Sequence, residues 1–261
     1  MLSIADRRLS ESPRSSGGLD SSKAPKAYAT AYARRVPVYL KPTAASASDA
    51  VLPSDPGHAL LLAQNLLGEP RMSNHSHGLW GYHGETEAGR PLTVQSTGIG
   101  GPSAAIVLRE LHELGVRRAV RIGACTPLQP GLEHGEAIVV TGTRTGDGTS
   151  AALGAGGSVS PDPALSDALS EAAGPGARAG LVASTDLFYG GGPGPAEALA
   201  VDLESAALFA LGGTLGLAVA ALLVVGSAPP DEAMIRLGAI ASAALAVAQV
   251  RSPGFGIASR A

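Results

Sequence analysis

The chain has 261 residues, of which 45% are hydrophobic and 3% aromatic, and its formal net charge is −3. This length and apolar content allow one sizeable core of aliphatic residues and exclude a collagen-like or wholly disordered chain. The single cysteine, Cys125, excludes a disulfide framework and a cysteine-based zinc site. This cysteine usage is typical of a protein of the reducing cytoplasm, the expected location, or of one that is indifferent to its redox compartment.

Charge is unevenly distributed along the chain. Residues 1–41 carry a net charge of +5, which leaves −8 for the rest. An acidic body lacks the clustered Lys and Arg that neutralise phosphates, so we expect no nucleic-acid partner. Ser, Pro and Gly content predicts a disordered basic tail over 1–35, without the apolar core of a secretory signal, and a folded domain over 36–261.

Strand and helix signals alternate from residue 92 onward. Leu92–Thr97 reads as a strand and runs directly into a glycine turn at Gly98–Gly101. Apolar residues then recur at helical spacing over Ser103–Leu114, and Pro102 stands where the first turn of a helix tolerates proline. This alternation predicts an α/β fold, a single domain with a twisted, mostly parallel central sheet flanked by helices.

The same signals continue through the middle of the chain. We expect three strands and one helix, in the order Ala119–Gly123, Ala137–Thr141, helix Pro163–Ala173 and Gly180–Ser184. Glycine- and proline-rich composition predicts loops at Gly146–Pro161 and Gly190–Pro195.

The segment Ala206–Ala228 contains 23 residues without a charge, which is long enough to span a bilayer. Glycines divide it, however, and no Lys or Arg flanks it as an anchor. A buried helix over Ser205–Leu215 followed by a buried strand over Ala218–Val225 explains the run more simply, so we expect no membrane partner. The last long helix is predicted over Ala233–Val250.

Three stretches carry residues suited to chemistry. The glycine turn Ser96–Ser103 would expose backbone N–H groups that an anion or a sugar can bind, or it is simply a tight turn. Arg121 falls at the end of a predicted strand, where open α/β sheets bind ligands. Since a buried arginine is rarely unpaired, either a carboxylate or an anionic ligand should face it.

The third stretch, Asp202–Ser205, opens a predicted helix. Carboxylates in a first turn suit the helix dipole, which is one interpretation. The other is that Glu204 points into a pocket and accepts hydrogen bonds from a polyhydroxy ligand such as ribose.

These stretches, in this order, resemble the nucleoside phosphorylase superfamily of the uridine phosphorylase and hexameric purine nucleoside phosphorylase type. The sequence S-T-G-I-G-G-P-S-A-A-I-V-L-R-E-L over Ser96–Leu111 is similar to that family's signature. Three further stretches that are similar to the family follow it: R-I-G-A-C at Arg121–Cys125, S-T-D-L-F-Y at Ser184–Tyr189 and V-D-L-E-S-A-A-L-F at Val201–Phe209. Over Ser96–Val140 the wording is closest to uridine phosphorylase.

The resemblance implies a pentosyltransferase that cleaves the N-glycosidic bond of a ribonucleoside with inorganic phosphate as co-substrate. It implies no metal or organic cofactor, and a dimer-based homo-oligomer up to a hexamer. Arg121 matches a phosphate-binding arginine and Glu204 the carboxylate that holds the ribose hydroxyls. Asp202 and Leu203 match neighbours that line the sugar pocket, and Phe188 matches the aromatic residue that packs against the nucleoside.

Several positions depart from the family's pattern. The phosphate loop begins at Ser54, and His58 stands where a second phosphate-binding arginine is usual. His77 occupies the place of the arginine that neighbouring subunits lend to each other, and Ala124 replaces a Ser or Thr that contacts phosphate and ribose. Ser227 lies in the region where purine enzymes carry an aspartate that protonates the base.

Three functions therefore remain open. The favoured one is phosphorolysis of a ribonucleoside of the uridine type, in nucleoside catabolism and salvage. Loss of phosphate-binding arginines favours a sister hydrolase that uses water, whereas the accumulated substitutions favour a nucleoside-binding homologue without full activity.

Overall fold

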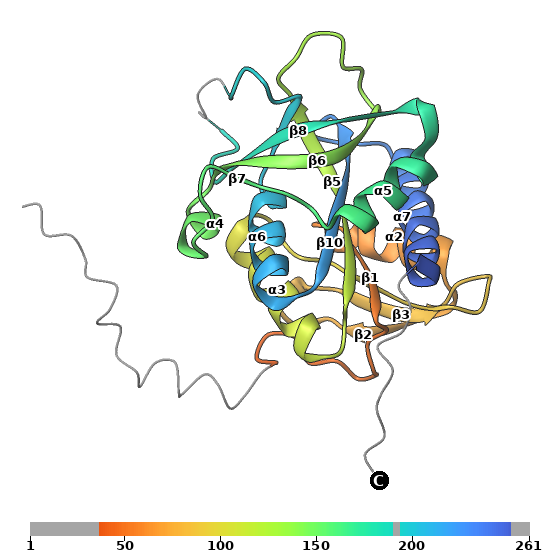
Figure 1. Cartoon of the computed structure of the whole chain (residues 1–261). Helices are drawn as coiled ribbons and strands as arrows, with labels where there is room; N and C mark the ends of the chain where they lie inside the picture. Colours follow the sequence, from red (N-terminus) through yellow and green to blue (C-terminus); the bar gives the residue numbers. More distant parts are fainter. Residues whose placement is uncertain (1–36, 190–193, 252–261) are drawn as a thin grey trace, which may run out of the picture. The chain divides into compact units, whose positions relative to one another are not determined.

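Within the residues that the computed structural model describes, 37–189 and 194–251, ten strands form one sheet that helices cover on both faces (Figure 1). The predicted tail over 1–35 lies outside the described residues, as do residues 190–193 of the predicted loop Gly190–Pro195. The mixed α/β architecture with a central sheet confirms the predicted fold class, but the described strands form five parallel and five antiparallel pairs, so the sheet is not mostly parallel as predicted.

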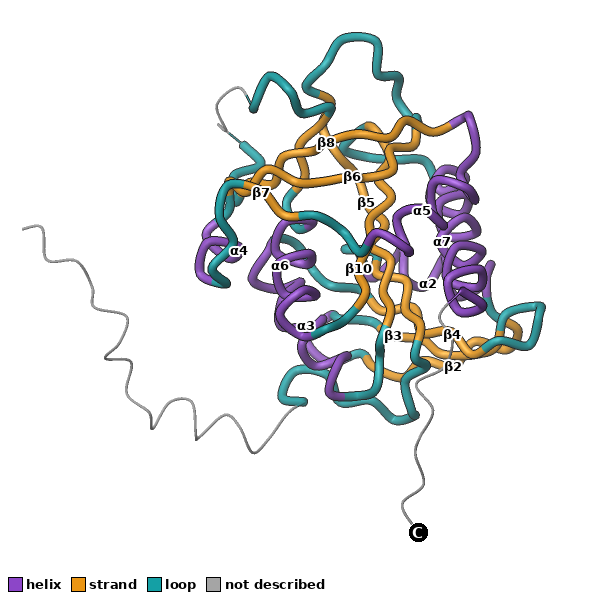
Figure 2. The backbone as a smooth tube through the Cα atoms, viewed as in Figure 1, coloured by secondary structure: helices purple, strands orange, loops and turns teal. Residues whose placement is uncertain are grey.

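Figure 2 distinguishes the helices, in purple, from the strands, in orange. The strands are β1 (Asp49–Leu52), β2 (Gly68–Asn74), β3 (Gly81–Glu85), β4 (Pro91–Gln95), β5 (Arg118–Pro127), β6 (Ala137–Gly146), β7 (Ser158–Val159), β8 (Ala177–Thr185), β9 (Ala200–Asp202) and β10 (Ala218–Val225). The helices are α2 (Pro56–Leu66), α3 (Gly101–Glu113), α4 (Gly148–Ala152), α5 (Pro163–Ala173), α6 (Ser205–Leu215) and α7 (Asp231–Arg251), with short 3₁₀ turns η2 (Ser76–Gly78) and η3 (Gly174–Gly176).

Five of the strands close into a ring. β5 pairs with β10, β10 with β6, β6 with β8, β8 with β9, and β9 returns to β5. The pairs β10–β6 and β9–β5 are antiparallel, whereas the other three pairs of the ring are parallel. From β5 the sheet continues through β1 and β4 in parallel and ends with the antiparallel strands β3 and β2.

Two layers of helices bury the two faces of this sheet. Helices α2, α5 and α7 lie together on one side, and α3 and α6 lie on the other (Figure 1). β10 is apolar at every position, as expected for a strand that is covered on both faces. The uncharged run over 206–228 thus forms α6 and β10, and among the described residues no helix is long and apolar enough to span a membrane.

Some predicted boundaries need correction. α5, α6 and β10 occupy the predicted residues, but the loop predicted over Gly146–Pro161 is wrong because it contains α4 and β7. Asp147 caps α4 by accepting a hydrogen bond from the Ser150 N–H at 2.7 Å. β5 also extends beyond the predicted strand end at Gly123, so Arg121 lies inside the strand instead of at its end.

The extension of β5 creates the site. On one edge, β1 pairs with β5 only as far as Arg121, and β9 pairs with it only from Thr126. On this edge, β5 therefore changes its neighbour over residues 122–125, between its last pair with β1 and its first pair with β9. Ligands of α/β proteins bind where neighbouring strands part in this way.

Candidate active site

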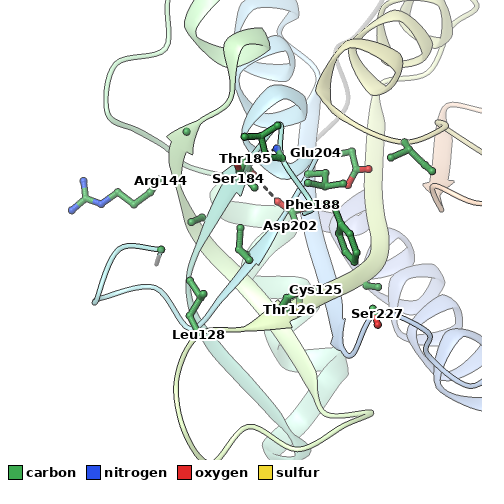
Figure 3. Close-up of a pocket in the computed structure, with 18 of the residues that line it drawn as sticks. Cys125, Thr126, Leu128, Arg144, Ser184, Thr185, Phe188, Asp202, Glu204 and Ser227 are labelled. Carbon is green, nitrogen blue, oxygen red and sulfur yellow. Dashed lines mark hydrogen bonds between the residues drawn. The ribbon is translucent and has the colours of Figure 1, made fainter. Parts of the chain in front are cut away.

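A cavity of about 790 Å³ opens where β1 and β9 part from β5 (Figure 3). Seven of the nine predicted site residues line it: Ser54, Arg121, Ala124, Phe188, Asp202, Leu203 and Glu204. The other residues that line it include Ile99, Cys125, Thr126, Leu128, Arg144, Ser184, Leu187, Tyr189 and Ser227. Residues predicted from widely separated stretches of sequence therefore lie in one cavity.

Arg121 lies at the inner end of this cavity and is 1% exposed. Its Nε donates to Asp202 Oδ2 at 3.1 Å, and its Nη2 donates to Glu204 Oε2. Its third nitrogen, Nη1, is buried and has no hydrogen-bond partner among the described residues. Burial by itself lowers the pKa of Arg121, but the two carboxylates outweigh burial and raise that pKa above its usual value.

Glu204 stands at the N-cap of α6, yet its side chain caps nothing there. Its carboxylate turns to Arg121 and accepts a hydrogen bond from the backbone N–H of Gly100 at 2.8 Å. Burial raises the pKa of Glu204, and the charge of Asp202 adds to this, although Arg121 and Gly100 oppose it. The carboxylate of Glu204 thus lies at the cavity, whereas the carboxylate of Asp202 accepts from the first N–H of α6, that of Ser205, at 3.0 Å, as the helix-dipole interpretation expects.

The glycine turn contributes the backbone around Glu204. Gly98 and Gly100 adopt φ values of 72° and 85°, which favour glycine. The N–H of Gly98 donates to the carbonyl of Ser54 at 3.0 Å, which ties the turn to the loop after β1. The N–H of Gly100 thus donates to a carboxylate of this chain, that of Glu204.

Apolar side chains surround the mouth of the cavity. Phe188 is 52% exposed, and its ring packs edge-on against Tyr189 with centroids 4.8 Å apart. Ile99 and Leu187 are exposed as well. Exposed aromatic and aliphatic groups at a cavity mouth suit a flat, mostly apolar portion of a ligand.

The two predicted histidines do not line the cavity. His58 lies in the first turn of α2, where its N–H donates to Asp55 Oδ1 at 3.0 Å. His77 is exposed, has a φ of 58°, and lies edge-on to Tyr39 with ring centroids 5.2 Å apart. Among the described residues that line the cavity, the cationic side chains are Arg121 and Arg144.

Both of these arginines are already paired. Arg144 Nε donates to Glu197 Oε1 at 2.8 Å, and half of each side chain is exposed. In the described part of the chain, no group of three or more His, Cys, Asp and Glu side chains is placed to hold a metal ion. The cavity therefore combines one buried guanidinium, two buried carboxylates and an apolar mouth.

Ser184 is the residue at this site that sequence reasoning missed. Its hydroxyl donates to Asp202 Oδ1 at 2.6 Å and accepts from the N–H of Ala206 at 3.0 Å. A serine at the end of a predicted strand carries no signal of such a contact. The contact depends on β8 and β9 lying side by side in the ring, with Ser184 opposite Asp202.

Cys125 lines the cavity but is not expected to react. Burial raises the pKa of its thiol to about 12, and the charge of Asp202 adds to this effect. About one thiol in ten thousand would then be ionised near pH 8, against about a quarter for an ordinary cysteine. Alkylation by iodoacetamide, followed by mass spectrometry, should be about a thousandfold slower in the native protein than in urea. Similar rates in the two states would contradict this thiol environment.

Comparison with known proteins gives a consistent picture. Residues 49–250 match the model of the phosphorylase superfamily. The chain is 31% identical over 192 residues to the DeoD-type purine nucleoside phosphorylase of Clostridium novyi, a match that covers 69% of this chain and 82% of the relative. It is 34% identical over 200 residues to the guanosine phosphorylase of Halorubrum lacusprofundi, covering 67% of this chain and 76% of the relative.

A third relative is the uridine phosphorylase of Klebsiella aerogenes, which is 35% identical over 150 residues and matches 54% of this chain and 57% of its own. The match to the superfamily model extends from the first strand, β1, to the last helix, α7, and so includes every element that lines the cavity. The chain belongs to the phosphorylase superfamily.

Proposed function

We propose that the protein cleaves the N-glycosidic bond of a ribonucleoside by phosphorolysis and releases the free base and ribose 1-phosphate. The observation that carries this proposal is the meeting of Arg121 and Glu204 at the inner end of one cavity, with Phe188 at its mouth. A cation for phosphate, a carboxylate for sugar hydroxyls and an aromatic ring for the nucleoside are the groups that such a reaction needs.

The chemistry assigns each group a role. The bond from C1′ to the base breaks and a bond from C1′ to a phosphate oxygen forms, through a transition state with oxocarbenium character as in glycoside hydrolysis. The base leaves with the bonding electrons and takes up a proton. Arg121 holds the phosphate, Glu204 holds the ribose hydroxyls, and both act by positioning the reactants in the transition state.

The identity of the base that the protein releases is the more specific part of the proposal. Uridine is the first substrate to test, because the wording of Ser96–Val140 resembles uridine phosphorylase. Inosine, adenosine and guanosine belong beside it, since relatives named as purine and guanosine phosphorylases match a larger share of this chain.

Release of base, measured with and without inorganic phosphate for each of these nucleosides, tests the proposal. Phosphorolysis requires that release depends on phosphate and saturates with it. Release at the same rate without phosphate would replace it with hydrolysis. Nucleoside binding without any release would indicate a binding protein.

Hydrolysis is the second candidate, and one specific observation favours it. Of the described residues that line the cavity, the two cationic ones are both ion-paired, and His58 and His77 lie elsewhere. A phosphate dianion would meet Arg121 through its one unpartnered nitrogen, Nη1, and would lie near the carboxylate of Glu204, which repels an anion but not a water molecule.

A second copy of the chain offers the completion that phosphorolysis needs. His77 is exposed and, by the family resemblance, stands where related subunits lend a side chain to each other, so we expect a dimer-based homo-oligomer. Light scattering on the purified protein tests this, and a monomeric mass at working concentration would leave the phosphate site without the side chain of His77 from a second copy.

A further inference from the structure

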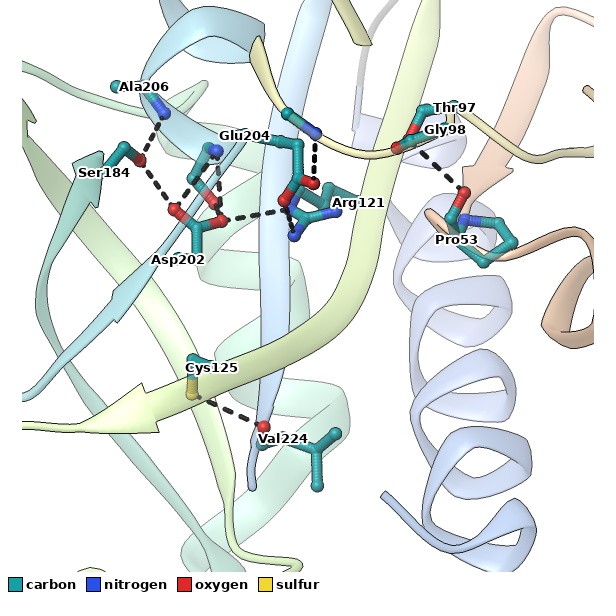
Figure 4. A network of polar contacts seen from close by, with 12 residues as sticks. Pro53, Thr97, Gly98, Arg121, Cys125, Ser184, Asp202, Glu204, Ala206 and Val224 are labelled. Atoms are coloured by element: carbon teal, nitrogen blue, oxygen red, sulfur yellow. Dashed lines mark hydrogen bonds and ion pairs between the residues drawn. The ribbon is translucent and has the colours of Figure 1, made fainter. Parts of the chain in front are cut away.

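The carboxylate of Asp202 is occupied by groups of its own chain (Figure 4). Its side chain is fully buried. Oδ1 accepts from Ser184 Oγ at 2.6 Å, and Oδ2 accepts from Ser205 Oγ at 2.6 Å, from the Ser205 N–H at 3.0 Å and from Arg121 Nε at 3.1 Å. A carboxylate with these partners has little capacity left for a sugar hydroxyl.

Ser184 fixes this carboxylate to the sheet. Its hydroxyl donates its one proton to Asp202 and accepts from the N–H of Ala206 in the first turn of α6. Ser184 is 1% exposed, so water does not compete for these bonds. The end of β8, the end of β9 and the start of α6 are thereby joined through two side chains.

The backbone of Gly123 supports the guanidinium of Arg121 from another direction. Arg121 and Gly123 lie two residues apart on β5 and so face the same side of the sheet. A Cβ atom at Gly123 would lie 2.9 Å from Nη2 of Arg121 and 3.1 Å from Cζ and Nη1. The guanidinium therefore lies directly over the glycine.

These contacts leave one nitrogen of Arg121 available. Asp202 holds Nε, Glu204 holds Nη2, and Nη1 is buried without a partner among the described residues. Asp202 is the more permanent of the two carboxylate contacts, because it has three further donors from Ser184 and Ser205. Glu204 accepts one further hydrogen bond, from the N–H of Gly100, and in the proposed function it must also accept hydrogen bonds from the ribose hydroxyls.

We propose that Asp202 and Ser184 are positioning residues, which hold Arg121 by Nε so that its Nη1 meets an oxygen of the phosphate, and that Asp202 does not contact the sugar. This inference rests on the proposed function, in which Arg121 binds phosphate. It assigns a role to Ser184 and replaces the sugar-lining role that the family resemblance implies for Asp202.

The first experiment compares Ser184→Ala with Ser150→Ala. Ser150 is a matched control, because its buried hydroxyl also donates to an aspartate, Asp147 Oδ1 at 2.6 Å, and it does not line the cavity. The affinity for inorganic phosphate is measured by calorimetry, and the KM values for phosphate and nucleoside are measured by base release. Ser184→Ala should weaken phosphate binding about tenfold and leave the nucleoside KM within about twofold, whereas Ser150→Ala should change neither.

A second variant, Gly123→Ala, disturbs the same guanidinium without touching Asp202. Since the clashing atoms are the far end of a flexible side chain, the protein should fold while Arg121 shifts. Phosphate binding should weaken by a similar factor. If both variants act through Arg121, the double variant should lose less than the product of the single losses, since sites that share a partner are not additive.

Three results would overturn the inference. If Ser184→Ala raises the nucleoside KM alone, Asp202 contacts the sugar and does not position Arg121 for phosphate. Unchanged phosphate binding in Ser184→Ala, with a loss of thermal stability like that of Ser150→Ala, would leave Ser184 a purely structural role. If the wild-type protein binds no inorganic phosphate, both this inference and the proposed function are wrong. If the wild type carries out phosphorolysis and the Ser184→Ala variant is unchanged, only this inference is wrong.

Discussion

Arg121→Ala is expected to lower the free energy of unfolding by about 3–5 kcal/mol, the usual cost of removing one partner from a buried ion pair. The reason is that Asp202 and Glu204 would remain buried without the cation between them. Urea denaturation of the variant and the wild type at the same pH measures the difference. The rate of phosphorolysis should also fall, by about ten- to a hundredfold, if Arg121 holds the phosphate.

The size of this loss should depend on pH. Burial and the charge of Asp202 already raise the native pKa of Glu204, and removal of Arg121 takes away the charge that opposes them. Between the unfolded pKa, about 4.3, and the raised native pKa, the native state binds more protons, so stability falls as pH rises. The deficit of the variant should therefore be smaller at about pH 5 than at about pH 8.

Arg109→Ala is the matched control for the loss of an arginine. Arg109 pairs with Glu113 at 2.8 Å on the surface of α3, with half of its side chain exposed. Its removal should cost only about 0.3–0.5 kcal/mol. A loss in Arg121→Ala no larger than in Arg109→Ala, or a deficit that does not vary with pH, would mean that the two carboxylates do not depend on Arg121.

Glu204→Gln is expected to slow the cleavage of ribonucleosides about ten- to a hundredfold, because hydrogen bonds to a charged acceptor contribute about 1.5–3 kcal/mol each. The variant keeps a side-chain oxygen that can accept from the N–H of Gly100, so the turn should remain in place. Steady-state kcat/KM for uridine, inosine and adenosine measures the effect.

The 2′-deoxynucleosides serve as the control for this variant. They lack one of the hydroxyls that Glu204 is proposed to hold, so Glu204→Gln should slow them much less than the ribonucleosides. Equal losses on both classes of substrate would show that Glu204 serves Arg121 alone, and that the ribose is held by other groups.

Much of this site could be predicted because its residues belong to short stretches that resemble those of one family. Arg121 and Glu204 are 83 residues apart in sequence, and the resemblance implied one site for both, although Arg121 lies inside β5 and not at the strand end that was predicted for it. The strong apolar patterns of α5, α6 and β10 also gave their boundaries correctly.

Other features depend on tertiary contacts that the sequence does not display. β5 continues beyond Gly123 because its next two residues pair with β10 and its last two pair with β9, and the antiparallel pairing with β9 closes the ring. β2, with the sequence GEPRMSN, has no apolar alternation, and its strand partner is β3. The family resemblance implied that Asp202 and Glu204 both lie at the site, but it did not indicate that Ser184 and Ser205 occupy the carboxylate of Asp202.

Phosphorus NMR of the wild-type protein, incubated with a cleavable ribonucleoside and inorganic phosphate, identifies the nucleophile. If phosphate attacks C1′, the inorganic phosphate signal should fall as that of a sugar 1-phosphate grows, in step with the release of base. Release of base with the inorganic phosphate signal unchanged would contradict phosphorolysis, because water would then be the nucleophile in the cavity that Arg121 and Glu204 share.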